Sequence, residues 1–126
     1  MVARHAVRIN GLDDIAVTKL DILDGMERLK ICTAYRVRGA TLQDFPADIE
    51  ALAQCEPVYE ELPGWRESTA NVTSAAGLPT AARRYLARIS ELLEVPIALV
   101  SIGSQRRQAF RMDEGAPRGA RSARAA

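Results

Sequence analysis

The sequence is short of several features, and each shortage excludes a class of protein. Its 126 residues include two cysteines, Cys32 and Cys55, which are too few for a disulfide framework and lack metal-ligand spacing. No apolar run approaches the roughly 18 residues of a membrane span. Residues 1–10 lack the apolar core of a signal peptide, so we expect a cytoplasmic location. The net charge of +1 favours neither a nucleic acid nor a membrane as partner.

What the chain does contain is typical of a globular protein with a distinct end. Hydrophobic residues make up 48% and charged residues 26% of it, and a chain of this length can bury a single core. The segment after Gln105 is different, because it carries six arginines against Asp113 and Glu114 and then only small residues, arginine and proline. We therefore divide the chain into a folded part, 1–108, and a disordered Arg/Ala-rich tail, 109–126.

The apolar pattern predicts mixed α and β structure. Helices are expected at 2–10, at 46–53 with Pro46 in the first turn, and at 79–94; extended segments are expected at 15–20, 29–37, 58–62 and 97–102. The 79–94 segment is the best-defined helix. A short link joins it to the buried strand expected at 97–102, and a helix followed closely by a strand is half of a parallel βαβ unit. If segments 15–20 and 97–102 are parallel neighbours, Asp21 and Gly103 lie at the same edge of a sheet.

The segment Lys19-Leu20-Asp21 follows the first apolar run, where open α/β sheets bind their ligands. A carboxylate there can accept two hydrogen bonds from guanine, at the ring N–H and the exocyclic amino group, whereas adenine offers no such donor pair on that edge. The lysine methylenes can lie flat against a base. Taken alone, the four residues 18–21 favour the plainer interpretation of a strand end with two solvated charges.

Several blocks in the same order make the guanine interpretation stronger, because together they resemble the C-terminal part of adenylosuccinate synthetase. The similarity covers about residues 1–108, the last third or quarter of that enzyme. The matching blocks are residues 2–7, 18–25, 30–36, 57–65, 78–79 with the helix that follows, and 95–103.

The resemblance implies a fold and a chemistry. The expected fold is α/β, a C-terminal fragment of a mostly parallel-sheet, P-loop-NTPase-like synthetase. Members of the family form homodimers and, with Mg²⁺, transfer the GTP γ-phosphate to IMP, after which L-aspartate displaces the phosphate to give adenylosuccinate. The catalytic residues, phosphate loop and magnesium ligands of the family all correspond to positions before Met1, so no catalytic residue is assigned here.

The resemblance also assigns a nucleotide site residue by residue. Lys19, Leu20 and Asp21 match the family's guanine-recognition segment. Ser101, Ile102 and Gly103 match a second base-contacting segment, in which the missing side chain of Gly103 lets the backbone come close to the base. The family usually has proline next, and Ser104 leaves this backbone freer than proline would.

Two kinds of function remain open. In the first, the chain is the guanine-binding part of an adenylosuccinate synthetase, inactive alone, with apolar surface uncovered on segment 97–102 or on the first helix. In the second, it is a non-catalytic guanine-nucleotide-binding or interaction module. The second predicts a monodisperse protein that binds GTP in preference to ATP.

Overall fold

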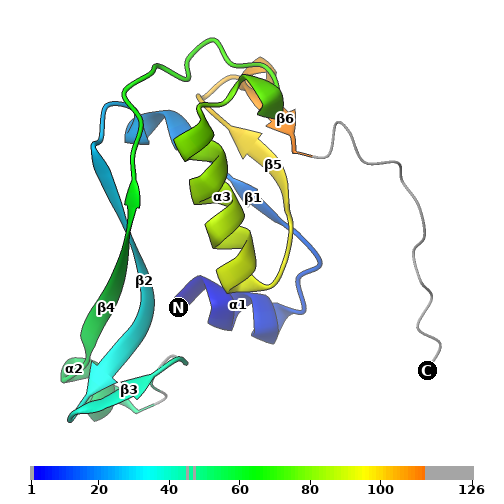
Figure 1. Cartoon of the computed structure of the whole chain (residues 1–126). Coiled ribbons are helices and arrows are strands. Elements are labelled where there is room, and N and C mark those ends of the chain that lie inside the picture. Colours follow the sequence, from blue (N-terminus) through cyan, green and yellow to red (C-terminus); the bar gives the residue numbers. More distant parts are fainter. Residues whose placement is uncertain (1, 45, 47, 113–126) are drawn as a thin grey trace.

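The computed structural model describes residues 2–44, 46 and 48–112. Two small sheets lie on either side of one long helix, with a short N-terminal helix near its end (Figure 1). In chain order the elements are α1 (Val2–Asn10), β1 (Ile15–Val17), the 3-10 turn η1 (Leu20–Leu23), β2 (Arg28–Val37), β3 (Ala40–Leu42), α2 (Ile49–Ala53), β4 (Glu56–Pro63), η2 (Ala75–Gly77), α3 (Thr80–Leu93), β5 (Ile97–Ser101), η3 (Arg106–Gln108) and β6 (Ala109–Arg111).

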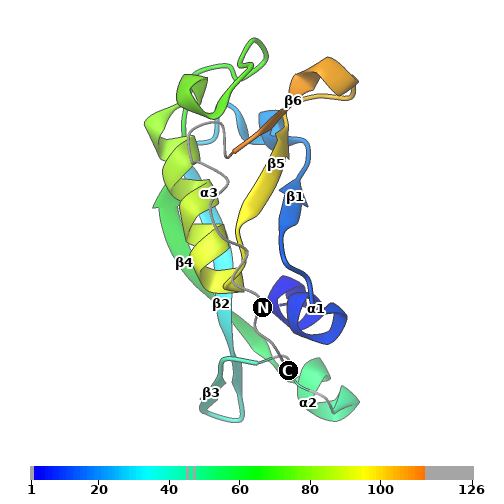
Figure 2. The same ribbon diagram turned by 90° about the vertical axis from the view of Figure 1, so that its right-hand side faces the viewer.

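The first sheet has the strand order β1-β5-β6. Strands β1 and β5 are parallel, with Val17 opposite Val100, and β6 runs antiparallel to β5. The second sheet, in the order β3-β2-β4, is antiparallel throughout the described strands. Helix α3 lies between the two sheets in Figure 1, and in the turned view of Figure 2 it lies in front of β2 and β4. The parallel pair is therefore joined by a long crossover that includes the whole second sheet and α3.

The core forms where α3 packs between the sheets. Leu86 and Ala82 of α3 are 1% and 0% exposed, and Val100 of β5 is 0% exposed. Their side chains belong to one cluster with residues from both sheets and from the segments that connect the strands and helices. The helix ends at Glu94, which adopts a left-handed conformation, and the chain then enters β5 at once. This short link agrees with the predicted helix-then-strand unit.

Apolar surface is left uncovered on two elements. Leu99 of β5 is 37% exposed, and Val2 and Ile9 of α1 are 59% and 69% exposed. Isolated exposed apolar residues are ordinary on protein surfaces. These three lie on the elements for which uncovered apolar surface was expected.

The expected helices and strands are present with differences at a few boundaries, and the structure adds β3 and β6, which the sequence pattern did not predict. The first strand ends at Val17 rather than at residue 20, because the chain turns into η1. The short helix begins after Asp48, whose carboxylate accepts a hydrogen bond from the backbone N–H of Glu50, and not in a first turn at Pro46.

One broader expectation, about the direction of the strands, needs correction. Among the described strands only the β1–β5 pair is parallel, so the arrangement is mixed rather than mostly parallel. The physical reason is clearest for β2 and β3, whose connection at residues 38–39 is too short for a parallel crossover. The P-loop-like part of the expected fold stays a prediction.

The predicted boundary at residue 109 is too early. Residues 109–111 form β6, which pairs with β5, and Phe110 is 6% exposed because its side chain packs in the core cluster. Residues 113–126, to which the rest of the disordered-tail prediction applies, lie outside the described residues. Over the part of the chain that is described, no helix has the length and apolar character needed to cross a membrane.

Candidate functional site

The parallel pairing of β1 and β5 brings the two predicted segments to one edge of the sheet. Val17 and Val100 are register partners near the ends of their strands. The chain leaving β1 reaches Lys19 and Asp21, and the chain leaving β5 reaches Gly103 (Figure 1). The carboxyl ends of parallel strands are where open α/β sheets bind ligands. Two segments more than eighty residues apart in sequence therefore border the same edge.

The first segment is a sharply turned piece of chain. Lys19 has φ 57° and ψ 44°, a left-handed conformation that costs a residue with a side chain about 1–2 kcal/mol. It precedes η1, whose first residue, Leu20, is 1% exposed and belongs to the core cluster. Leu20 therefore contributes its backbone to any site, while its side chain anchors the turn. Lys19 itself is exposed.

Asp21 has a buried polar atom that lacks a partner among the described residues. Its Oδ1 atom is buried and receives no hydrogen bond from the described residues. A buried carboxylate oxygen without a donor costs at least about 1–3 kcal/mol. Native proteins pair nearly all such atoms, so an orphaned one needs an explanation. A ligand that brings N–H donors to this edge would remove the cost.

The second segment is held by its own short loop. Ser101 Oγ donates a hydrogen bond to the carbonyl oxygen of Gly103 at 2.7 Å. The backbone N–H of Ile102 donates to the carbonyl oxygen of Gln108 at 2.9 Å, and Ile102 is only 2% exposed. Ile102, like Leu20, thus packs its side chain in the core and leaves its backbone at the edge. Ser104 is exposed.

Gly103 has a local packing role that the sequence did not reveal. A Cβ atom at this position would overlap the side-chain amide of Gln108. That amide also accepts a hydrogen bond from the backbone N–H of Gln105, as part of a capping box around η3. The space beside Gly103 is therefore used by Gln108 in this structure. A base approaching Gly103 would lie close to that amide.

Sequence reasoning missed a cluster directly behind the first segment. The carboxylate of Asp24 accepts hydrogen bonds from a distant loop. Trp65 Nε1 donates to Oδ1 at 2.7 Å, and the backbone N–H of Thr69 donates to Oδ2 at 2.7 Å. The Trp65 ring also packs against Tyr85 of α3, with 6.1 Å between the ring centroids. No local signal could find this cluster, because the partners are 41 and 45 residues away.

Charge pairs elsewhere shift pKa values without forming a site. Hydrogen bonds from Arg88 hold the pKa of Glu60 below its ordinary value of 4.5. In the same way, Arg28 holds the pKa of Glu61 low, with a smaller contribution from Lys30. These are ion pairs along β4, on the second sheet, and each carboxylate already has a cationic partner.

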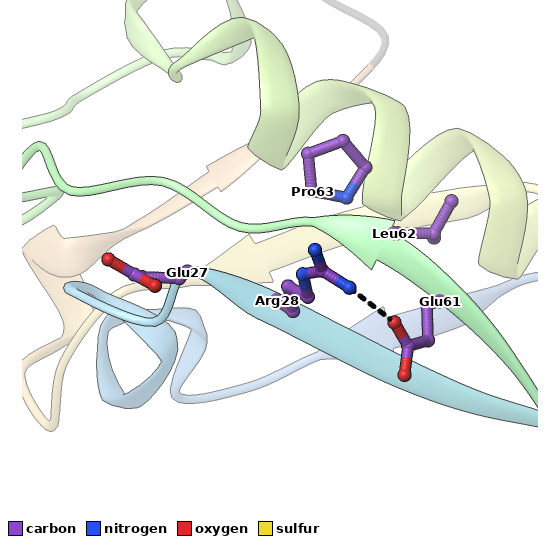
Figure 3. Close-up of a pocket in the computed structure, with 5 residues that line it drawn as sticks. All are labelled: Glu27, Arg28, Glu61, Leu62 and Pro63. Atoms are coloured by element: carbon purple, nitrogen blue, oxygen red, sulfur yellow. Dashed lines mark hydrogen bonds and ion pairs between the residues drawn. The ribbon is translucent and has the colours of Figure 1, made fainter.

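A hollow of about 350 Å³ lies where β2 and β4 meet, and Figure 3 shows its lining. Arg28 donates a hydrogen bond to Glu61 across it at 3.1 Å, so its main charges already neutralise each other. None of the six predicted site residues lines it. The residues that do are Glu27, Arg28, Glu61, Leu62 and Pro63.

The family model for adenylosuccinate synthetase matches residues 1–110 of the chain. The chain belongs to the adenylosuccinate synthetase family. The sequence is 56% identical over 108 residues to the adenylosuccinate synthetase of Desulfosudis oleivorans, a match that covers 86% of this chain and 25% of that protein. It is 48% identical over 114 residues to the Desulforamulus reducens enzyme, covering 90% and 27%. The chain thus spans about a quarter of the length of the curated synthetases that it matches.

The fold agrees with that membership. A fully ligated adenylosuccinate synthetase from Plasmodium falciparum superposes with a TM-score of 0.81 at 30% identity. That superposition covers 86% of this chain and 26% of the synthetase structure. Within the described residues, no three His, Cys, Asp or Glu side chains are grouped so as to hold a metal ion.

Proposed function

We propose that this chain is the guanine-recognition part of an adenylosuccinate synthetase. The whole enzyme would form adenylosuccinate from IMP, L-aspartate and GTP in AMP biosynthesis. In this assignment Asp21 accepts hydrogen bonds from the guanine N–H groups, and the stem of Lys19 lies against the base. Backbone groups of residues 101–103 border the base from the neighbouring strand.

The observation that carries the proposal is the buried, unpaired Oδ1 atom of Asp21. Guanine brings two N–H donors on one edge, whereas adenine brings none in that arrangement. Hydrogen bonds to a charged acceptor contribute about 1.5–3 kcal/mol each. Two of them would favour GTP over ATP by at least one order of magnitude. The parallel β1–β5 edge supports this location for the site, and the family membership supports a guanine nucleotide as the ligand.

The remaining machinery is assigned to the part of a synthetase that this chain does not cover. By resemblance, the acid and base, the phosphate loop, the magnesium ligands and the IMP and aspartate sites belong there. We therefore expect the chain alone to make no adenylosuccinate, and turnover by pure material would contradict this. A homodimer, implied by the family resemblance, and a cytoplasmic location, expected from the N-terminal sequence, stay predictions.

The test is an NMR titration of the isotopically labelled chain with GTP and, separately, with ATP. GTP is expected to shift backbone resonances around residues 19–21 and 101–103 at lower concentration than ATP. Asp21→Asn places an amide donor against the guanine donors, and the preference for GTP should fall at least tenfold. Asp13→Asn, an exposed aspartate on the preceding loop, is the matched control and should keep the preference. An unchanged preference in Asp21→Asn would remove Asp21 from the site.

One observation favours the second candidate, a non-catalytic guanine-nucleotide-binding or interaction module. The described residues bury a core of their own around α3, as an independently folding module must. A part of a larger enzyme is expected to leave apolar surface uncovered on β5 or α1, where Leu99, Val2 and Ile9 are exposed. Sedimentation separates the two, since a module should stay monodisperse at high concentration. Self-association that is abolished by Ile9→Ser and Leu99→Ser together would favour the synthetase part.

A further inference from the structure

Asp24 is connected to Asp21 through the backbone of η1. The N–H of Asp24 donates a hydrogen bond to the carbonyl oxygen of Asp21 at 3.1 Å, which closes the C-terminal end of the turn. A 3-10 segment of four residues has poor hydrogen-bond geometry and does not hold its shape by itself. The orientation of Asp21 therefore depends on what fixes the two ends of η1. Leu20, buried in the core, fixes the first end.

The carboxylate of Asp24 fixes the second end. It receives hydrogen bonds from Trp65 Nε1 and from the backbone N–H of Thr69, and Thr69 Oγ1 lies 3.0 Å from both of its oxygens. The donors are rigidly placed, because Trp65 is 3% exposed and Thr69 is 0% exposed. A further backbone bond, from Gly25 N–H to the carbonyl oxygen of Trp65 at 2.9 Å, joins the same two loops.

We propose that Asp24 is a positioning residue for nucleotide selection: anchored by Trp65 and Thr69, it holds Asp21 in the orientation that meets the guanine edge. Both carboxylate oxygens of Asp24 accept hydrogen bonds from Trp65 or Thr69, so in this proposal Asp24 does not contact the base. The inference rests on the proposed function of Asp21. It adds the loop of residues 65–69 as the support of the Asp21 carboxylate. No pattern in the sequence connects this loop to the proposed nucleotide edge.

The experiment is the same titration with Asp24→Asn in the whole chain. Asparagine replaces one acceptor oxygen by an N–H donor, which must face a donor of Trp65 or Thr69 and so breaks at least one bond. The affinity for GTP should fall about ten- to a hundredfold, as misplacement of a binding group by about 1 Å does. The affinity for ATP should stay within about twofold, because adenine lacks the donors that Asp21 pairs with.

Two comparisons separate positioning from general loss of structure. Asp21→Asn added to Asp24→Asn should lower the preference for GTP no further than Asp21→Asn alone, since both act through one group. Leu93→Ala, a core variant at the far end of α3, should lower the melting temperature but keep the preference. Where Asp24→Asn does not fold, Thr69→Val removes only the hydroxyl and should weaken GTP binding in the same direction, whereas Thr69→Ser restores it.

The outcomes also separate this inference from the proposed function. If Asp21→Asn abolishes the preference while Asp24→Asn and Thr69→Val both keep it, the positioning role is wrong and the guanine site stands. If the wild-type chain binds ATP as well as GTP, both are wrong. Hydrogen exchange adds a readout without nucleotide: amides of η1 should exchange faster in Asp24→Asn than in Leu93→Ala. Equal protection of η1 in these two variants would overturn the positioning role.

Discussion

The candidate nucleotide edge, where β1 and β5 end, and the β2–β4 hairpin are stabilised by different interactions. At the edge, Asp24 is hydrogen-bonded to Trp65 and Thr69, which are almost fully buried. Along the hairpin, the polar interactions are ion pairs with exposed side chains, such as Arg28–Glu61, whose side chains are 77% and 45% exposed. Hydrogen bonds away from water are costly to break, whereas exposed ion pairs are screened and contribute little. The edge is therefore the part of the molecule whose shape is strongly determined.

This comparison predicts unequal consequences of substitution. Changes at the edge or at its junction with the hairpin should lower stability substantially and should not depend strongly on salt. Changes in the hairpin ion pairs should have small effects that vary with pH and ionic strength.

The largest effect is expected at Gly64, where the hairpin meets the edge. A Cβ atom there would overlap the backbone carbonyl of Met26, and neither backbone has room to move, because Gly64 N–H donates to the carbonyl oxygen of Glu27 at 2.9 Å. Gly64→Ala should therefore cost more than about 4 kcal/mol or prevent folding. Gly77→Ala is the control, since its Cβ would meet only a Val72 methyl group at 3.4 Å. Urea unfolding that gave equal stabilities for the two variants would contradict the clash.

A smaller effect is expected when the buried network loses one donor. Trp65→Phe keeps a ring beside Tyr85 but removes the indole N–H that Asp24 accepts. The cost should be about 1–3 kcal/mol, because a buried carboxylate oxygen loses a partner. Tyr59→Phe, on the hairpin and 54% exposed, should change the stability by less than about 0.5 kcal/mol. Chemical unfolding followed by circular dichroism measures both, and a larger loss in Tyr59→Phe would reverse the comparison.

The smallest effect concerns the ion pair between Arg88 of α3 and Glu60 of β4, whose side chains are 35% and 33% exposed. Because the pKa of Glu60 is lower in the folded chain than its ordinary 4.5, the pair stabilises the fold above that pH. This stabilisation is lost as the pH falls through the folded pKa. Arg88→Gln should therefore melt slightly below the wild type at neutral pH, and the difference should disappear in acid.

Thermal melting at about pH 7 and about pH 3 tests this last prediction. The difference in melting temperature at neutral pH should also shrink in 1 M salt, because the electrostatic screening length there is on the order of tenfold shorter than at low salt. A difference in melting temperature that grows toward acid pH would contradict the sign. Arg83→Gln is a suitable control, because Arg83 lies on the same helix and its contact is a hydrogen bond at 3.4 Å to Thr80 rather than a carboxylate.

Much of the fold could be predicted from local pattern. The apolar spacing around Leu86 predicts α3, and the structure confirms a helix at Thr80–Leu93. The run at 97–102 predicts a buried strand, and Val100 is fully buried in β5. These predictions succeed because periodic apolar positions bury the same face whatever the partner is. The ending of β1 at Val17 could not be predicted, since Leu20 continues the apolar run but turns into the core.

The candidate site could be predicted in part. The chemistry of Asp21 and the family resemblance indicate the nucleotide edge from the sequence alone. That Leu20 and Ile102 bury their side chains, and that Gly103 makes room for Gln108, follows only from packing. Their role in binding guanine stays a prediction for the titrations above.

The sequence by itself determined the family, most of the helical and extended segments, and the carboxylate that we propose distinguishes guanine from adenine. These depend on residue type and on spacing along the chain. Tertiary structure decided which segments meet: β1 with β5 across a long crossover, and Asp24 with Trp65 and Thr69. It also decided that Asp21 has a buried oxygen without a donor. Such features arise between residues far apart in sequence, because burial and hydrogen-bond geometry depend on how the whole chain packs.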